Sequence, residues 1–149
     1  KIHLQQILAD KKNIVLHAEL QAVPEFYFDG NRIGQVVDNL LSNAVKYSPP
    51  DKEVFIKLVS NGETMTLSVK DEGPGISPDE QGQLFQHFKK LSARPTGGES
   101  SSGLGLAIAQ RIVEEHQGEI GVDSQLGHGA TFHFSLPTTR RGASTTLPK

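Results

Sequence analysis

The sequence contains no cysteine among its 149 residues, which excludes disulfide bonds and metal sites built on thiolates. The chain also has no large excess of either charge, because it contains 15 lysines and arginines and 17 aspartates and glutamates. The formal net charge of -2 gives no general attraction to nucleic acid or to an acidic membrane, so a bound anion must be held locally. No apolar run is long enough to cross a bilayer, and no signal peptide opens the chain. We therefore expect a soluble, cytoplasmic protein without a nucleic-acid partner and without direct membrane contact.

The length suits one domain with a real hydrophobic core, which we place at residues 1–137. The chain begins with Lys1 instead of Met, and apolar residues at helical spacing, Leu4 and Ile7, occur directly after it. We therefore expect a piece of a longer protein, with a domain shortened at its N-terminus. Residues 138–149 are rich in Thr, Ser and Arg, and they are expected to form a disordered tail.

Hydrophobic periodicity and turn residues divide the chain into strands and helices. After Asn61-Gly62, the apolar Met65, Leu67 and Val69 alternate with polar residues, which indicates a sheet with one buried face. Strands are expected at 13–20, 53–60, 64–70, 119–124 and 130–136, and helices at about 31–48, 77–90 and 104–117. In the last strand Phe132, Phe134 and Leu136 are expected to be buried.

The helix that contains residues 38–47 carries an unusual polar face. Asn39, Asn43 and Lys46 fall on a narrow arc at about 3.6 residues per turn. Short neutral amides stepped by four residues can coordinate a cation or phosphate oxygens, whereas an ordinary solvated face would favour Glu and Lys. A plain surface and a site for a metal-bound polyphosphate are about equally supported by this helix alone. The opposite half, expected in the core, comprises Val36, Val37, Leu40, Leu41, Ala44 and Val45.

A glycine-containing segment follows the strand that ends near Lys70. Asp71-Glu72-Gly73-Pro74-Gly75 can be simply a turn, since Gly and Pro are common turn residues. Alternatively, Asp71 accepts a hydrogen bond from an exocyclic amine, while Gly73 and Gly75 let a flat ring approach the backbone. Adenine fits the second interpretation.

A second glycine-containing segment, Ser102-Gly103-Leu104-Gly105-Leu106, opens a predicted helix. A glycine-rich turn at a helix N-terminus presents free N–H groups and a favourable dipole to a phosphate. The pattern matches neither the P-loop nor the dinucleotide fingerprint, and a lone Gly-x-Gly is weak evidence.

The order of these segments resembles the ATP-binding catalytic domain of sensor histidine kinases in two-component systems. The amide helix, Asp-x-Gly-x-Gly, the run Leu84-Phe85-Gln86-His87-Phe88 and Gly103-Leu104-Gly105-Leu106 stand where that family has its N box, first glycine box, phenylalanine box and second glycine box. The resemblance covers roughly residues 13–137. It implies the fold of a wider ATPase superfamily: an α/β two-layer sandwich with a mixed, mostly antiparallel sheet covered on one face by about three helices.

The resemblance also implies roles for individual residues. Asn43 would be the main Mg²⁺ ligand with Asn39 beside it, and Lys46 and Tyr47 would reach phosphate or ribose. Residues 85–103 would form a lid over ATP, with Lys90 touching phosphate. The remaining expected nucleotide contacts are Asp71, Gly73, Gly75, Ile76, Phe88, Ser102, Gly103, Leu104, Gly105 and Leu106.

The reaction expected from the resemblance is transfer of the γ-phosphoryl group to a histidine on a separate dimerisation domain. Hydrolytic branches of the superfamily carry a glutamate where this chain has Asn39, and an amide cannot activate water as a base. Asn39, Lys46 and Lys90 are the expected catalytic residues. None of the six histidines is expected to be phosphorylated. The implied partners are the dimerisation domain and a response regulator, and the full kinase is expected to be cytoplasmic or anchored in the membrane. A serine kinase of the anti-sigma type and a nucleotide-responsive binding module are the alternatives.

Overall fold

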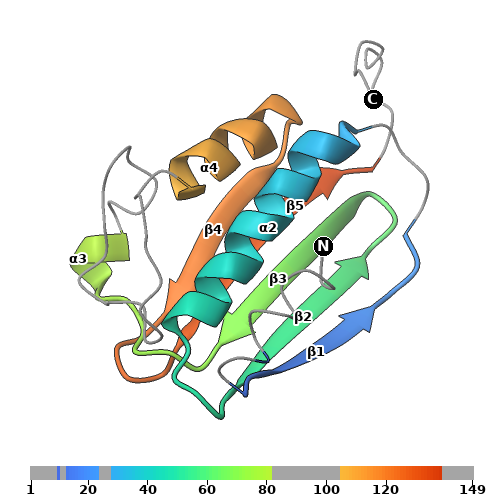
Figure 1. Ribbon diagram of the computed structural model, residues 1–149. Coiled ribbons are helices and arrows are strands. Elements are labelled where there is room, and N and C mark those ends of the chain that lie inside the picture. The colour runs from blue at the N-terminus through green and yellow to red at the C-terminus, as the bar shows by residue number, and fades with distance from the viewer. Residues whose placement is uncertain (1–9, 11–12, 24–27, 82–104, 139–149) are drawn as a thin grey trace.

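The computed structural model describes residues 10, 13–23, 28–81 and 105–138, which form an α/β sandwich of two layers. One layer is a five-stranded sheet in the order β1-β2-β3-β5-β4. Helices α2 (Gly30–Tyr47) and α4 (Gly105–Glu115) lie side by side over one face of it, and the single-turn helix α3 (Pro78–Gln81) lies near one end (Figure 1). The strands are β1 (Val15–Leu20), β2 (Glu53–Ser60), β3 (Thr64–Asp71), β4 (Glu119–Ser124) and β5 (Ala130–Pro137).

The sheet is mixed, because β1 pairs in parallel with β2 while the other neighbouring strands are antiparallel. The parallel pair is possible because the whole of α2 connects β1 to β2, which gives the chain the length that a crossover needs. The expected α/β sandwich with a mostly antiparallel sheet is confirmed.

Helix α2 is positioned by its caps and by its apolar stripe. The Asp29 carboxylate accepts hydrogen bonds from the N–H groups of Asn31 and Arg32, which satisfies donors that the first turn cannot pair internally. The helix ends at Ser48, directly before Pro49, since proline at the next position disfavours helical backbone. Its buried residues are Ile33, Val36, Leu40, Leu41, Ala44 and Val45, so the half predicted to face the core does so, with Val37 partly buried.

The hairpin of β2 and β3 sets the register that places the site. Asn61 Oδ1 accepts from the N–H groups of Glu63 and Thr64, and Gly62 takes a φ of 93° in the turn. Along β3 buried residues alternate with half-buried or exposed ones, which brings Asp71 at the strand end onto the same buried face as Met65 and Val69. A carboxylate therefore stands at the edge of the apolar core.

The pairing of β3 with β5 closes the core under the helices. Asp71 faces Ala130 in this register, and Val69 faces Phe132. Phe132, Phe134 and Leu136, the set predicted to be buried, are at most 5% exposed. The described chain continues through Thr138, whose N–H and hydroxyl bond to the carbonyls of Glu63 and Gly62. Thr138, with which the expected tail begins, is thus buried against the β2–β3 turn, and the tail itself stays a prediction.

Candidate functional site

A cavity lies where the C-terminal end of α2 meets the end of β3 and the start of β5. The cavity is narrow and partly open, with a volume of about 20 Å³. Most of its lining is apolar, which is the kind of surface that a flat heterocycle packs against. The described residues that line it are Asn43, Tyr47, Asp71, Pro74, Gly75, Ile76, Ala130 and Phe132.

Asp71 is the one carboxylate among these lining residues. Its Oδ1 accepts two backbone hydrogen bonds, from Gly73 N at 2.9 Å and from Ala130 N at 3.2 Å. Burial raises the pKa of this carboxyl from 3.8 to about 6, although the two N–H groups pull the pKa downward. Neither bond uses Oδ2. A side chain held in this way can offer its second oxygen to a donor inside an otherwise apolar cavity.

The glycines after Asp71 serve the packing of this corner. A Cβ on Gly73 would lie 2.7 Å from the Tyr47 carbonyl oxygen, at the end of α2. A Cβ on Gly75 would lie 2.2 Å from the Gln125 carbonyl oxygen, and Gly75 also has a φ of 81°. A side chain at Gly73 or Gly75 would therefore collide with the protein's own backbone, whether or not a ligand is bound. Gly75 lines the cavity, whereas Gly73 contacts the helix end.

The amide arc of α2 runs from the cavity towards α4. Asn43 lines the cavity, and Asn39 lies one helical turn earlier, about 6 Å along the axis at 1.5 Å per residue. The Asn39 side-chain nitrogen donates to the Gly105 carbonyl at 3.0 Å, in the first turn of α4. A carbonyl can only accept, so the amide nitrogen must face it, and the Asn39 oxygen is left for another partner.

The start of α4 fits closely against this amide. A Cβ on Gly105 would lie 3.3 Å from Asn39 Oδ1, tighter than an ordinary contact. The first N–H groups of a helix have no partner within the helix, and their dipole favours an anion. The amide arc therefore connects the cavity, which Asn43 lines, to the first turn of α4, which Asn39 contacts.

The structure brings together many of the residues predicted from sequence. One cavity is lined by Asn43, Tyr47, Asp71, Gly75 and Ile76. Asn39 contacts Gly105 between α2 and α4, and Leu106 is a buried residue of α4. Lys46 and Gly73 lie next to these residues in sequence but are not among the cavity lining. Phe88, Lys90, Ser102, Gly103 and Leu104 fall outside the described residues, as do residues 82–90 of the helix expected at 77–90.

The sequence interpretation missed three lining residues: Pro74, Ala130 and Phe132. Phe132 was predicted to be buried, but nothing in a single sequence pairs β5 with β3. The available signal was the inward-facing alternation of β5, which extends back from Phe132 to Ala130.

Several known proteins are similar to this chain in sequence or in fold. A family model described as histidine kinase-, DNA gyrase B- and HSP90-like ATPase matches residues 28–140. The sensor protein SrrB of Staphylococcus aureus is 43% identical over 110 residues, which cover 74% of this chain and 19% of SrrB. The chain thus spans about a fifth of the length of that curated relative.

Solved structures of sensor kinases share the fold. Full-length ShkA in complex with AMPPNP gives a TM-score of 0.78 at 31% identity, covering 92% of this chain and 28% of ShkA. The mycobacterial sensor histidine kinase MprB gives 0.74 at 28% identity, covering 89% of this chain and 94% of that one. The catalytic domain of histidine kinase ThkA gives 0.77 at 26% identity, covering 92% and 87%.

The fold and the cavity define an ATP-binding sandwich domain. The chain belongs to the histidine kinase-, DNA gyrase B- and HSP90-like ATPase family, and its resemblance within that family is to the ATP-binding catalytic domains of sensor histidine kinases. No helix in the described part of the chain is long and apolar enough to cross a membrane.

Proposed function

We propose that the cavity binds the adenine of ATP, with the Asp71 carboxylate accepting a hydrogen bond from the exocyclic amine. The observation that carries this proposal is the placement of Asp71: it is 5% exposed, fixed through Oδ1 by two N–H groups, and set in a mostly apolar cavity. Ile76 and Phe132 supply apolar surface for the ring. Tyr47 stands at the rim of the same cavity, at the end of α2.

The triphosphate would follow the amide arc towards α4. Asn43 and Asn39 offer neutral oxygen ligands, the donor type that Mg²⁺ prefers, and magnesium bound to ATP takes its other ligands from phosphates and water. The bond from Asn39 Nδ2 to Gly105 leaves its oxygen free for this purpose, so the residues fit the ion. Bound Mg²⁺ would neutralise phosphate charge. Gly105 and the first turn of α4 would add backbone N–H groups.

The reaction that this site supports is transfer of the γ-phosphoryl group to a histidine of a dimerisation domain in the same kinase. Phosphoryl transfer needs mainly positioning and charge neutralisation, which Asn39, Lys46 and the α4 N-terminus would provide, with Lys90 of the expected lid as a further phosphate contact. Asn39 carries no basic group to activate water, so ATP would be held without rapid hydrolysis. A response regulator would then take the phosphoryl group from that histidine, on the cytoplasmic side.

The test is to incubate the chain with γ-labelled ATP and Mg²⁺, alone and with the histidine-bearing domain of its full-length kinase. We expect label only in the mixture, on the histidine domain, and lost on acid treatment because phosphohistidine is acid-labile. The control is the same domain with its acceptor histidine replaced by glutamine, which should stay unlabelled. Acid-stable label would indicate a serine kinase. Binding without any transfer would indicate a nucleotide-responsive module, and label on the isolated chain would contradict the role of a separate acceptor.

A further inference from the structure

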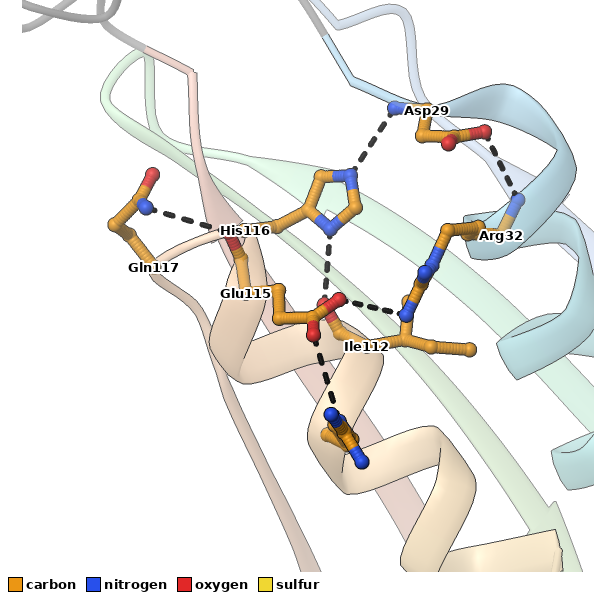
Figure 2. A network of polar contacts seen from close by, with 7 residues as sticks. Asp29, Arg32, Ile112, Glu115, His116 and Gln117 are labelled. Carbon is orange, nitrogen blue, oxygen red and sulfur yellow. Dashed lines mark hydrogen bonds and ion pairs between the residues drawn. The ribbon is translucent and has the colours of Figure 1, made fainter. Parts of the chain in front are cut away.

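His116 joins the two helices of the sandwich at the end away from the cavity. It follows the last residue of α4 and is 7% exposed. Its Nδ1 lies 2.9 Å from the Ile112 carbonyl oxygen, and its Nε2 lies 3.0 Å from the Asp29 backbone nitrogen (Figure 2). Both ring nitrogens are therefore used, one by each helix.

The two partners determine where the ring carries its hydrogen. The Ile112 carbonyl can only accept, so Nδ1 must donate to it, and the Asp29 N–H can only donate, so Nε2 must accept. The donor bond also satisfies a carbonyl at the helix C-terminus, because the backbone N–H of His116 bonds to Val113 instead. An apolar side chain here would leave a buried donor and a C-terminal carbonyl without these partners.

The group that His116 holds is the N-cap of α2. Asp29 has an extended backbone with φ of -85° and ψ of 103°, its carbonyl accepts from Ile33, and its carboxylate accepts from Asn31 and Arg32. Its own N–H goes to His116. An ion pair between Arg32 and Glu115 at 2.6 Å lies beside this bond, but both side chains are nearly half exposed, so we assign it a smaller contribution.

Helices α2 and α4 are thus fastened to one another at two points. At one point His116 accepts from Asp29, and at the other Asn39 donates to Gly105. Along α2 the two contacts are ten positions apart, from Asp29 to Asn39, and along α4 they are eleven positions apart, from Gly105 to His116. Both spans are therefore about 15–17 Å at 1.5 Å per residue. Two rigid helical spans of similar length, bonded to each other at both ends of the span, have little freedom to slide along or rotate against each other.

We propose that His116 is a positioning residue for the phosphate half of the nucleotide site. By fixing the C-terminal end of α4 to the start of α2, it holds Gly105 and the first N–H groups of α4 against the Asn39 amide. The adenine half does not depend on this fastening, because Asp71 is held by Gly73 and Ala130 at the end of the sheet. Loss of the histidine bonds would therefore loosen phosphate and magnesium binding selectively. This inference rests on the proposed function.

The test compares Mg-ATP with adenosine, which reaches only the base half of the site. For His116→Leu, calorimetry should show Mg-ATP affinity lowered by roughly fivefold to tenfold, the effect of about one misplaced hydrogen bond, with adenosine affinity within about twofold of the wild type. His116→Gln keeps a donor nitrogen and an acceptor oxygen on one side chain and should recover at least half of the loss on a logarithmic scale. The control Ile56→Val trims a residue of β2 that is 2% exposed, and it should lower the Tm without changing the ratio of the two affinities.

The outcomes separate the two proposals. If the wild-type chain binds neither ligand, the proposed function fails. If it binds both and His116→Leu keeps the wild-type ratio of affinities, or loses both affinities equally as a merely destabilised fold would, the positioning role is wrong. Should His116→Leu fail to fold, His116→Phe, which keeps a flat ring at that place, is measured in its stead and judged by the same ratio.

Discussion

The substitution Asp71→Asn is expected to weaken nucleotide binding while stabilising the fold. Asparagine has the same shape and retains an Oδ1 acceptor for the Gly73 and Ala130 N–H groups. Its second terminal atom, however, is a donor nitrogen instead of a carboxylate oxygen. That nitrogen would face the adenine amine, donor against donor, so the variant separates the ligand role of Asp71 from its structural role.

The magnitudes follow from the burial of the carboxylate. Loss of a charge-assisted hydrogen bond, about 1.5–3 kcal/mol, should weaken ATP binding by roughly tenfold to 150-fold. The stability of the fold depends on the pKa of Asp71, which is about 6 in the folded protein and therefore above the ordinary value of 3.8. The folded protein therefore retains a proton that the unfolded chain releases, and stability falls as pH rises between these two values. At pH 7 the ionised carboxylate costs up to about 3 kcal/mol, which the neutral amide avoids.

Urea denaturation and calorimetry on both proteins measure the two effects. At pH 7 the variant should unfold at a higher urea concentration than the wild type, while at pH 4 the difference should shrink towards zero. ATP titration at pH 7 should show the weaker affinity. Equal ATP affinity would mean that adenine does not contact Asp71. A variant less stable than the wild type at pH 7 would mean that the two backbone bonds outweigh the cost of burying the charge.

Three further predictions concern the same corner of the molecule. Lowering the pH from 7 to 5 should weaken ATP binding to the wild type more than to Asp71→Asn, because the Asp71 carboxylate of the ligand-free protein takes up a proton near pH 6. The variant is the control for titration of the ATP phosphate itself, and equal pH profiles of the two proteins would contradict this prediction. Asn43→Ala should remove the gain in ATP affinity that Mg²⁺ provides while leaving the circular dichroism spectrum unchanged, and a magnesium gain of wild-type size would contradict the ligand role. Gly75→Ala should destabilise the fold by more than about 2 kcal/mol in urea, because its Cβ would overlap the Gln125 carbonyl and its φ is positive; a wild-type midpoint would contradict this packing.

The elements that were predictable from sequence are those with a strong local pattern. The strands expected at 53–60 and 119–124 have those bounds in β2 and β4, and β5 is one residue longer than expected. Period-two alternation, proline stops and an Asn-Gly turn act within a few residues, so a single sequence records them. The parallel pairing of β1 with β2 was not predicted, because strand partners are chosen by the core as a whole.

The contacts that build the site join residues far apart in the chain, and these were beyond the sequence. Asn39 meets Gly105 across 66 positions, and Asp29 meets His116 across 87. From sequence, His116 was only one of six histidines that were not expected to be phosphorylated, and no contact was predicted for it. Gly73 was expected to make room for a ring, which stays a prediction; the sequence did not predict that its missing side chain also makes room for the end of α2. The residue types therefore indicated which ligand groups the site could bind, while only the folded structure shows which residues contact one another.

A crystal structure of the chain with a non-hydrolysable ATP analogue and Mg²⁺ tests the proposed position of the nucleotide most directly. The predicted result has the adenine amine within hydrogen-bonding distance of the Asp71 carboxylate and the phosphates running past Asn43 and Asn39 to the first turn of α4. Adenine bound elsewhere, or phosphates directed away from the amide arc of α2, would contradict it.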